Sequence, residues 1–138
     1  MNPIRTSRRN SRRGLATVEA ALIFPLLLTI TFAAIEYGWM FLKQEQIVDT
    51  ARQAARIGAA WDSNRADVTD EIATEMQSAG MEDSGYTQRV PDPARTTRGR
   101  DYTVTISVPY HNIEITGVTL FPLPKTISAT VSMQKEGP

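Results

Sequence analysis

Cysteine is absent from this chain of 138 residues, and histidine occurs only once, at His111. Without cysteine the protein has no disulfide framework, no thiolate zinc site and no thiol nucleophile. A single histidine argues against a histidine-based metal site and against a catalytic triad. The glycine-rich phosphate-binding and dinucleotide-binding motifs and the HExxH motif of zinc peptidases are also missing. We therefore predict a protein that is not an enzyme and that holds no metal or cofactor.

Acidic residues are missing from residues 1–13, which contain five arginines, although the net charge of the whole chain is zero. These residues have no apolar face that could offset the entropy of ordering, which predicts a disordered tail. Arginines in such a tail can bind nucleic acid through its phosphates. An apolar segment follows directly, however, and this favours a positive flank that stays in the cytoplasm. We therefore expect no nucleic-acid partner.

A long apolar run follows the basic tail, and its only charged residue between residues 20 and 42 is Glu36. A helix over these residues is about 34 Å long, which is enough to cross a hydrocarbon core of about 30 Å. The rest of the chain is too short to bury a helix that is apolar all round. The run therefore predicts a membrane-spanning helix, with Glu36 exposed beside Tyr37 and Trp39 at the membrane interface. Pro25 inside it predicts a kink.

The helix is expected to continue beyond the membrane, over residues 15–60 as a whole. Its second half is amphipathic, because one stripe of small and apolar residues repeats at helical spacing, namely Ile47, Ala51, Ala54 and Gly58. Residues 65–79 form a second amphipathic pattern that begins after Asn64, a favourable N-cap, and ends at Gly80. Residues 82–100 contain two prolines, two glycines and many polar residues, which predicts an irregular connection.

The end of the chain alternates between apolar and polar residues, which predicts strands with one buried face. One alternation runs from Tyr102 to Tyr110 and another from Ile127 to Met133, and residues 111–119 suggest a further short strand. The predicted fold class is α+β. A long N-terminal helix spans the membrane with its first half, and its amphipathic second half packs against a short helix and a small antiparallel sheet.

Glu19 is the single acid in the first part of the apolar helix, five residues after Gly14. An acidic side chain in a membrane segment is costly and needs a partner, so Glu19 is a candidate functional residue. The alternative is that it only marks the edge of the membrane, where a charge costs less.

The combination of a basic leader, Gly14 and Glu19 ahead of an apolar helix resembles the processing site of type IV prepilins. The resemblance implies that a prepilin peptidase cuts between Gly14 and Leu15 and that Glu19 becomes the fifth residue of the mature protein. The run VEAALIFP, the triplet Glu36-Tyr37-Gly38 and the stretch ARQAAR at residues 51–56 resemble TadE-like pseudopilins of the tight-adherence (Flp) pilus system. A type IV pilin-like fold is implied.

The same resemblance implies a role and a set of partners. Glu19 of an incoming subunit would meet the free amino terminus of a neighbouring pilin during assembly. The partners would be the prepilin peptidase, other pilins or pseudopilins and the pilus assembly platform. The chain would be a minor pilin or pseudopilin needed to assemble a Tad pilus.

The expected organisation has three parts: a leader over residues 1–14, a membrane helix over residues 15–42 and a periplasmic domain over residues 43–138. The protein would sit in the bacterial inner membrane with its N-terminus in the cytoplasm. Two alternatives remain open from the residues. One is an uncleaved signal anchor that carries a periplasmic binding module. The other is a removable twin-arginine signal at residues 11–15.

Overall fold

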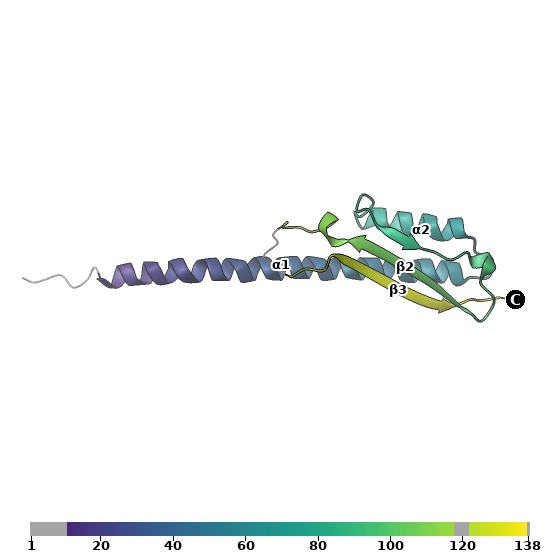
Figure 1. Cartoon of the computed structure of the whole chain (residues 1–138), viewed down its shortest axis with the longest axis horizontal. Helices are drawn as coiled ribbons and strands as arrows, with labels where there is room; N and C mark the ends of the chain where they lie inside the picture. Colours follow the sequence, from purple (N-terminus) through teal and green to yellow (C-terminus); the bar gives the residue numbers. More distant parts are fainter. Residues whose placement is uncertain (1–10, 118–121, 138) are drawn as a thin grey trace, which may run out of the picture. The chain divides into compact units, whose positions relative to one another are not determined.

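The computed structural model describes residues 11–117 and 122–137, and Figure 1 shows their elements. In chain order these are α1 (Ser11–Ala59), α2 (Arg65–Ser78), β1 (Thr87–Arg89), the 3-10 turn η1 (Pro93–Arg95), β2 (Asp101–Pro109), the 3-10 turn η2 (Tyr110–Asn112) and β3 (Thr126–Gln134). A long apolar N-terminal helix, a short helix and a small antiparallel sheet confirm the predicted α+β class.

The chain divides into two compact units, one that ends at Ile35 and one that begins at Glu36. Helix α1 runs through this boundary without a break. The first unit consists, in its described residues, of the apolar part of α1. The second unit contains the rest of α1 and all other elements. The predicted division at residue 42 refers to a membrane and stays a prediction.

Helix α1 begins earlier than the sequence predicts, at Ser11 rather than at Leu15. The expectation of a disordered tail up to residue 13 is therefore wrong for residues 11–13, while residues 1–10 lie outside the described part of the chain. The physical reason is that extending an existing helix adds a hydrogen bond for each residue fixed, and arginine is a good helix former.

The second half of α1 buries the predicted stripe. Ile47, Ala51 and Ala54 are fully buried, and Gly58 is buried beside them. They share one core with the three inward residues of α2, which are Val68, Ile72 and Met76, and with the inner face of the sheet. Because several of the α1 residues are alanine or glycine, neighbouring side chains approach this face of the helix closely.

Helix α2 has the start and end that the sequence predicts. Asn64 accepts a hydrogen bond from the Asp67 amide, and the Asp67 side chain accepts one from the Asn64 amide, which completes a capping box. After Ala79 the chain turns at Gly80, where φ is +62°. Glycine adopts this left-handed conformation without a steric penalty, so the helix stops there.

The sheet is antiparallel with the order β1-β2-β3. Alternate residues of β2 are buried, as predicted, while its other face pairs hydroxyl groups with β3: Thr103 with Ser132 at 2.6 Å and Thr105 with Thr130 at 3.0 Å. Strand β3 buries Ile127 and Ala129. This sheet covers the apolar face of α1 with its inner side and presents a hydroxyl-rich outer side.

Two expectations about the connections are wrong. Residues 82–100 are not irregular throughout, because they contain β1, which pairs with β2, and η1. The further strand expected over residues 111–119 is not formed in its described part, residues 111–117. There the chain makes η2 and then bends. The buried residues Tyr110 and Ile113 are three residues apart, and this spacing does not fit the two-residue alternation that a strand requires.

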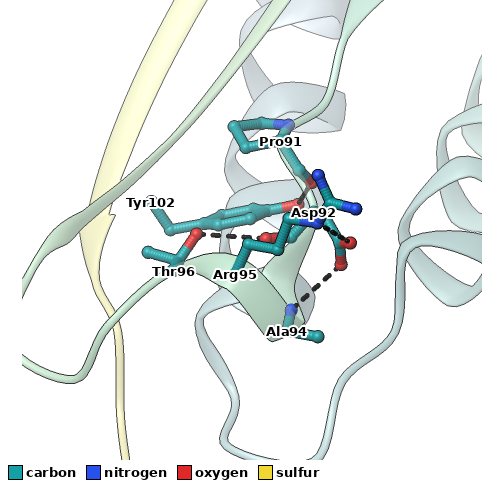
Figure 2. Close-up of polar contacts among 6 residues, drawn as sticks. All are labelled: Pro91, Asp92, Ala94, Arg95, Thr96 and Tyr102. Carbon is teal, nitrogen blue, oxygen red and sulfur yellow. Dashed lines mark hydrogen bonds and ion pairs between the residues drawn. The ribbon is translucent and has the colours of Figure 1, made fainter.

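Figure 2 shows how the connection between β1 and β2 is closed. Asp92 accepts a hydrogen bond from the Ala94 amide at 3.1 Å and pairs with Arg95 at 3.3 Å, so it caps the 3-10 turn. The buried Tyr102 donates its hydroxyl hydrogen bond to the carbonyl of Pro91 at 3.0 Å. The connection therefore holds the aromatic ring of Tyr102 in a fixed place against the core.

The end of α1 is capped by a lysine from the other end of the chain. Lys135 is buried and donates hydrogen bonds to the carbonyls of Gly58 and Ala60 and to the Ser63 hydroxyl. A cation at a helix C-terminus satisfies carbonyls that have no partner in the helix and complements the helix dipole. No local sequence pattern predicts this contact, because its partners lie 72–77 residues apart in the chain.

Candidate functional site

Gly14, Leu15 and Glu19 all lie on α1 and are exposed, with Leu15 71% exposed. A side chain at Gly14 would meet no atom within 4 Å. Leu15 and Glu19 are four residues apart and lie on the same face of the helix, one turn from each other. The bond between Gly14 and Leu15 is thus open to a partner, and Glu19 lies close to the amino group that cutting this bond would create.

The surface around Glu19 combines small and apolar side chains. A shallow depression on the helix is lined by Ala16, Glu19, Ala20, Ile23, Phe24 and Leu27. Small residues one turn apart allow another helix to approach the backbone closely in a membrane. The face that carries the acid therefore has the small side chains that close approach of a second helix would require.

The apolar part of α1 is exposed in the part of the chain that the structure describes. Residues 14–35 are exposed throughout, except that Ala33 is half-buried. In the described part of the chain, the helix over Gly14–Ala59 is the one that is long and apolar enough to cross a membrane. Within it, the hydroxyls of Thr29 and Thr31 donate to the carbonyls of Pro25 and Leu27 at 2.8 Å, so neither hydroxyl needs water. The predicted kink at Pro25 stays a prediction.

Glu36 is fully buried, so the expectation that it is exposed is wrong. Its carboxylate accepts hydrogen bonds from the Tyr110 hydroxyl at 2.5 Å, the Thr116 hydroxyl at 2.6 Å and the Thr116 amide at 3.0 Å. Burial and the neighbouring Glu36 raise the pKa of Tyr110, which keeps its hydroxyl protonated as a donor. Sequence reasoning missed these partners because they lie 74 and 80 residues away.

Tyr37 and Trp39 also bind the segment after β2. The Tyr37 hydroxyl donates to the carbonyl of Pro122 at 3.0 Å, and the Trp39 indole donates to the carbonyl of Ile113 at 2.7 Å. Both side chains are half-buried rather than free. Their predicted place at a membrane interface remains a prediction, but each ring already has a protein partner for its polar group.

Lys43, the residue after the apolar run, lies inside the protein and contacts both Trp39 and the end of α2. It is buried, its ammonium lies 4.8 Å from the centre of the Trp39 ring, and it donates to the carbonyl of Ala79 at 2.6 Å. Burial lowers the pKa of Lys43. The residue therefore caps the end of α2 and fixes α2 against α1, in addition to ending the apolar run.

Within residues 11–117 and 122–137, no three histidine, cysteine or acidic side chains are arranged to hold a metal ion. The polar groups that do converge, around Glu36, bind one another. This arrangement positions a chain segment.

Residues 14–56 match the TadE-like protein family. This match confirms the resemblance identified from the sequence. Neither a curated protein nor a solved structure matches the chain. The TadE-like segment begins at Gly14, contains Leu15, Glu19, Pro25 and the triplet Glu36-Tyr37-Gly38, and ends with Arg56 in the core-facing half of α1.

The TadE-like segment supplies the helix residues of the Glu36 cluster, while Tyr110 and Thr116 come from outside it. The segment therefore contains both the candidate processing site and the anchor points for the rest of the second unit. A sequence signal for Tyr110 exists, because it is the last inward residue of the β2 alternation. For Thr116 the sequence carries no such signal.

We expect Glu36→Gln to destabilise the second unit by about 1–3 kcal/mol, because the amide nitrogen replaces one acceptor and faces a donor that then lacks a partner. Tyr110→Phe removes one donor from the buried carboxylate and should cost about 1.5–3 kcal/mol, because hydrogen bonds to charged groups are the stronger ones. Denaturant unfolding of the full-length protein in detergent measures both. Glu45→Gln, at an exposed position of the same helix, is the matched control. Equal stability of the Glu36 and Glu45 variants would contradict the assignment.

Proposed function

We propose that this protein is a minor pilin or pseudopilin that takes part in assembly of a Tad (Flp) type IV pilus. The observation that carries the proposal is the match to the TadE-like family, which begins at Gly14 and continues through the whole exposed apolar helix. The family belongs with a pilus system and is not a family of enzymes. The convergent polar groups of the second unit, which bind one another, agree with a structural role.

In this proposal a prepilin peptidase cuts the chain between Gly14 and Leu15. The exposure of both residues and the open space around Gly14 support access to the bond. The five arginines ahead of Gly14 are removed with the leader, and the apolar helix stays on the mature protein. Leu15 then carries a new α-ammonium group next to the membrane face that holds Glu19.

Glu19 acts in assembly by pairing with the amino terminus of a neighbouring pilin. Opposite charges attract strongly where the dielectric constant is low, but removing both from water takes much of that free energy back. The pair therefore fixes the register between two helices more than it raises their affinity. Ala16 and Ala20 beside Glu19 support this role, because they let the neighbouring helix come close enough for the pair to form.

The protein is anchored in the inner membrane by a single helix with its N-terminus in the cytoplasm, and residues 43–138 lie on the periplasmic side. Five arginines precede the helix, whereas residues 43–138 have 10 basic and 13 acidic side chains, a net charge of −3. The positive-inside rule favours this orientation. The other pilins and the assembly platform would meet the protein in and above the membrane.

We expect a periplasm-active reporter fused after Pro138 to be active in a bacterial host. The same reporter fused after Ser11, ahead of the span, is the matched control and should be inactive. A fusion after Pro138 that works only with a cytoplasm-active reporter would contradict the orientation and, with it, the pseudopilin role.

A further inference from the structure

Three consecutive contact points tie the segment after β2 to α1 immediately beyond the fully exposed apolar run. Trp39 binds the carbonyl of Ile113, Glu36 binds Thr116 and Tyr37 binds the carbonyl of Pro122. We call residues 113–117 and 122–123 the collar. Since all of these contacts are made by residues 36–39, the collar lies level with the first turn of α1 in the second unit.

The opposite face of α1 stays apolar and exposed beyond this level. Phe41 is 65% exposed and Leu42 is 49% exposed, and Gly38 beside them is also exposed. At about 100° per residue these positions point away from Glu36. The next exposed position on that face is charged, at Glu45. The apolar surface of the helix therefore ends at Leu42 on one face, about 9 Å farther along the axis than Glu36.

The outer surface of the collar is also largely apolar, like the exposed face of α1 at Phe41 and Leu42. Ile115 is 53% exposed, Pro122 is exposed, and Leu123 is half-buried against the core. Glu114 is the one charged residue of the collar and is half-buried, and residues 115–117 and 122–123 carry no charged side chain. The collar has irregular backbone, which a membrane tolerates only where polar groups have partners, and the carbonyls of Ile113 and Pro122 are bound by Trp39 and Tyr37.

We propose that the collar lies at the boundary between the hydrocarbon and the headgroups of the outer leaflet and that Ile115 and Pro122 contact lipid there. This inference rests on the proposed function, in which the apolar part of α1 crosses the membrane. Lipid that covers Phe41 and Leu42 must also surround the helix at the lower level of residues 36–39, where the collar is bound. Tyrosine and tryptophan favour this layer, because their rings are apolar and their polar groups need partners.

The consequence is a membrane contact made by two separate parts of the chain. The helix enters the bilayer, and the collar widens the base of the second unit at the surface. The hydrogen bonds of Glu36 hold the two parts together, which gives this buried acid a role in setting the depth at which the second unit sits on the membrane. Loss of the collar contact would leave the unit attached by the helix alone.

Site-directed spin labelling tests the proposal, because the chain has no native cysteine. Full-length variants Ile115→Cys, Phe41→Cys, Leu28→Cys and Asp62→Cys are labelled with a nitroxide and placed in vesicles of phosphatidylethanolamine and phosphatidylglycerol. A high ratio of lipid to protein keeps copies apart. Oxygen concentrates in lipid and a nickel chelate stays in water, so the ratio of their collision rates with the nitroxide reports its surroundings.

We expect oxygen collisions to exceed nickel collisions at residues 28 and 115, and the ratio to reverse at the exposed residue 62. Residue 41 lies farther out along α1 than the collar, so its ratio should fall between those at residues 115 and 62. A label at 115 that behaves like the one at 62 would overturn the proposal while the span at residue 28 still stands. A label at 115 shielded from both reagents would show protein cover instead of lipid and would also overturn it. Nickel collisions dominating at residue 28 would refute the membrane span and therefore the proposed function.

Discussion

Replacing Gly58 by alanine should destabilise the second unit by about 3 kcal/mol or more, although alanine is normally the better helix former by about 1 kcal/mol. A Cβ atom at this position would lie 2.7 Å from the Tyr102 hydroxyl oxygen and closer still to ring carbons Cε1 and Cζ. The Tyr102 ring is fully buried and is held by its hydrogen bond to Pro91, as Figure 2 shows. Moving the ring away from this Cβ would shift it within the core and strain its hydrogen bond to Pro91.

Gly38→Ala is the matched control, because Gly38 lies on the same helix and a Cβ atom there would have no neighbouring side chain within 4 Å. We expect it to leave stability unchanged or to raise it by up to about 1 kcal/mol. In a Tyr102→Ala background, Gly58→Ala should cost little, since the clashing ring is gone, and the two substitutions should be far from additive. Denaturant unfolding of the full-length variants in detergent measures these differences. Equal effects of Gly58→Ala in both backgrounds would show that the clash is not the cause.

Glu19→Gln should abolish pilus assembly while the protein is still inserted and at least partly cut. Glutamine keeps the shape of the side chain and its depth in the membrane but removes the charge that pairs with a neighbouring amino terminus. It also lowers the cost of inserting the helix, so membrane localisation should be retained. The measurement is piliation, together with crosslinking to other pilins, in a host whose only copy carries the substitution.

Two further variants separate assembly from processing. Glu19→Asp keeps a carboxylate and should restore part of the piliation that Glu19→Gln loses. Gly14→Val should block the pathway earlier and leave an uncut precursor with its basic leader, which a mass shift detects. Normal pili with Glu19→Gln would contradict the assembly role and favour the alternative interpretation, in which Glu19 is a charge at the edge of a membrane helix.

Local periodicity explains why much of the second unit could be predicted from the sequence. The stripe at Ile47, Ala51, Ala54 and Gly58 is buried as its spacing predicts, and the alternation in β2 is buried in the same way. The capping box at Asn64 is likewise encoded within four residues. Such signals require only neighbours along the chain, so they can be read without knowing the fold.

The features that sequence reasoning missed depend on residues far apart in the chain. Strand β1 is three residues long and fully exposed, so it has no alternation, and only its pairing with β2 makes it a strand. Glu36 stands beside aromatic residues at the end of an apolar run, which suggested exposure, but its burial depends on Tyr110 and Thr116. Lys135 reaches a carbonyl 77 residues earlier. No local sequence pattern predicts these contacts.

The candidate processing site, in contrast, could be predicted from residues that are close together in the sequence. Gly14 and Glu19 were identified from their spacing and from the basic leader, and the family match begins at the same glycine. The fold adds that both residues are exposed on α1 and that the face of Glu19 carries small side chains. The proposed role of this site involves a peptidase and other pilins, so its test is made in the cell.

The most direct test of the pseudopilin role is the N-terminus of the mature protein, determined by N-terminal sequencing or intact mass after isolation from a bacterial host with its own pilus system. Cleavage after Gly14 predicts that the protein begins at Leu15 and retains the whole apolar helix. A protein that still begins at Met1 would contradict this account and favour an uncleaved anchor, and one that begins after Ala33 would contradict it by showing removal of a signal peptide.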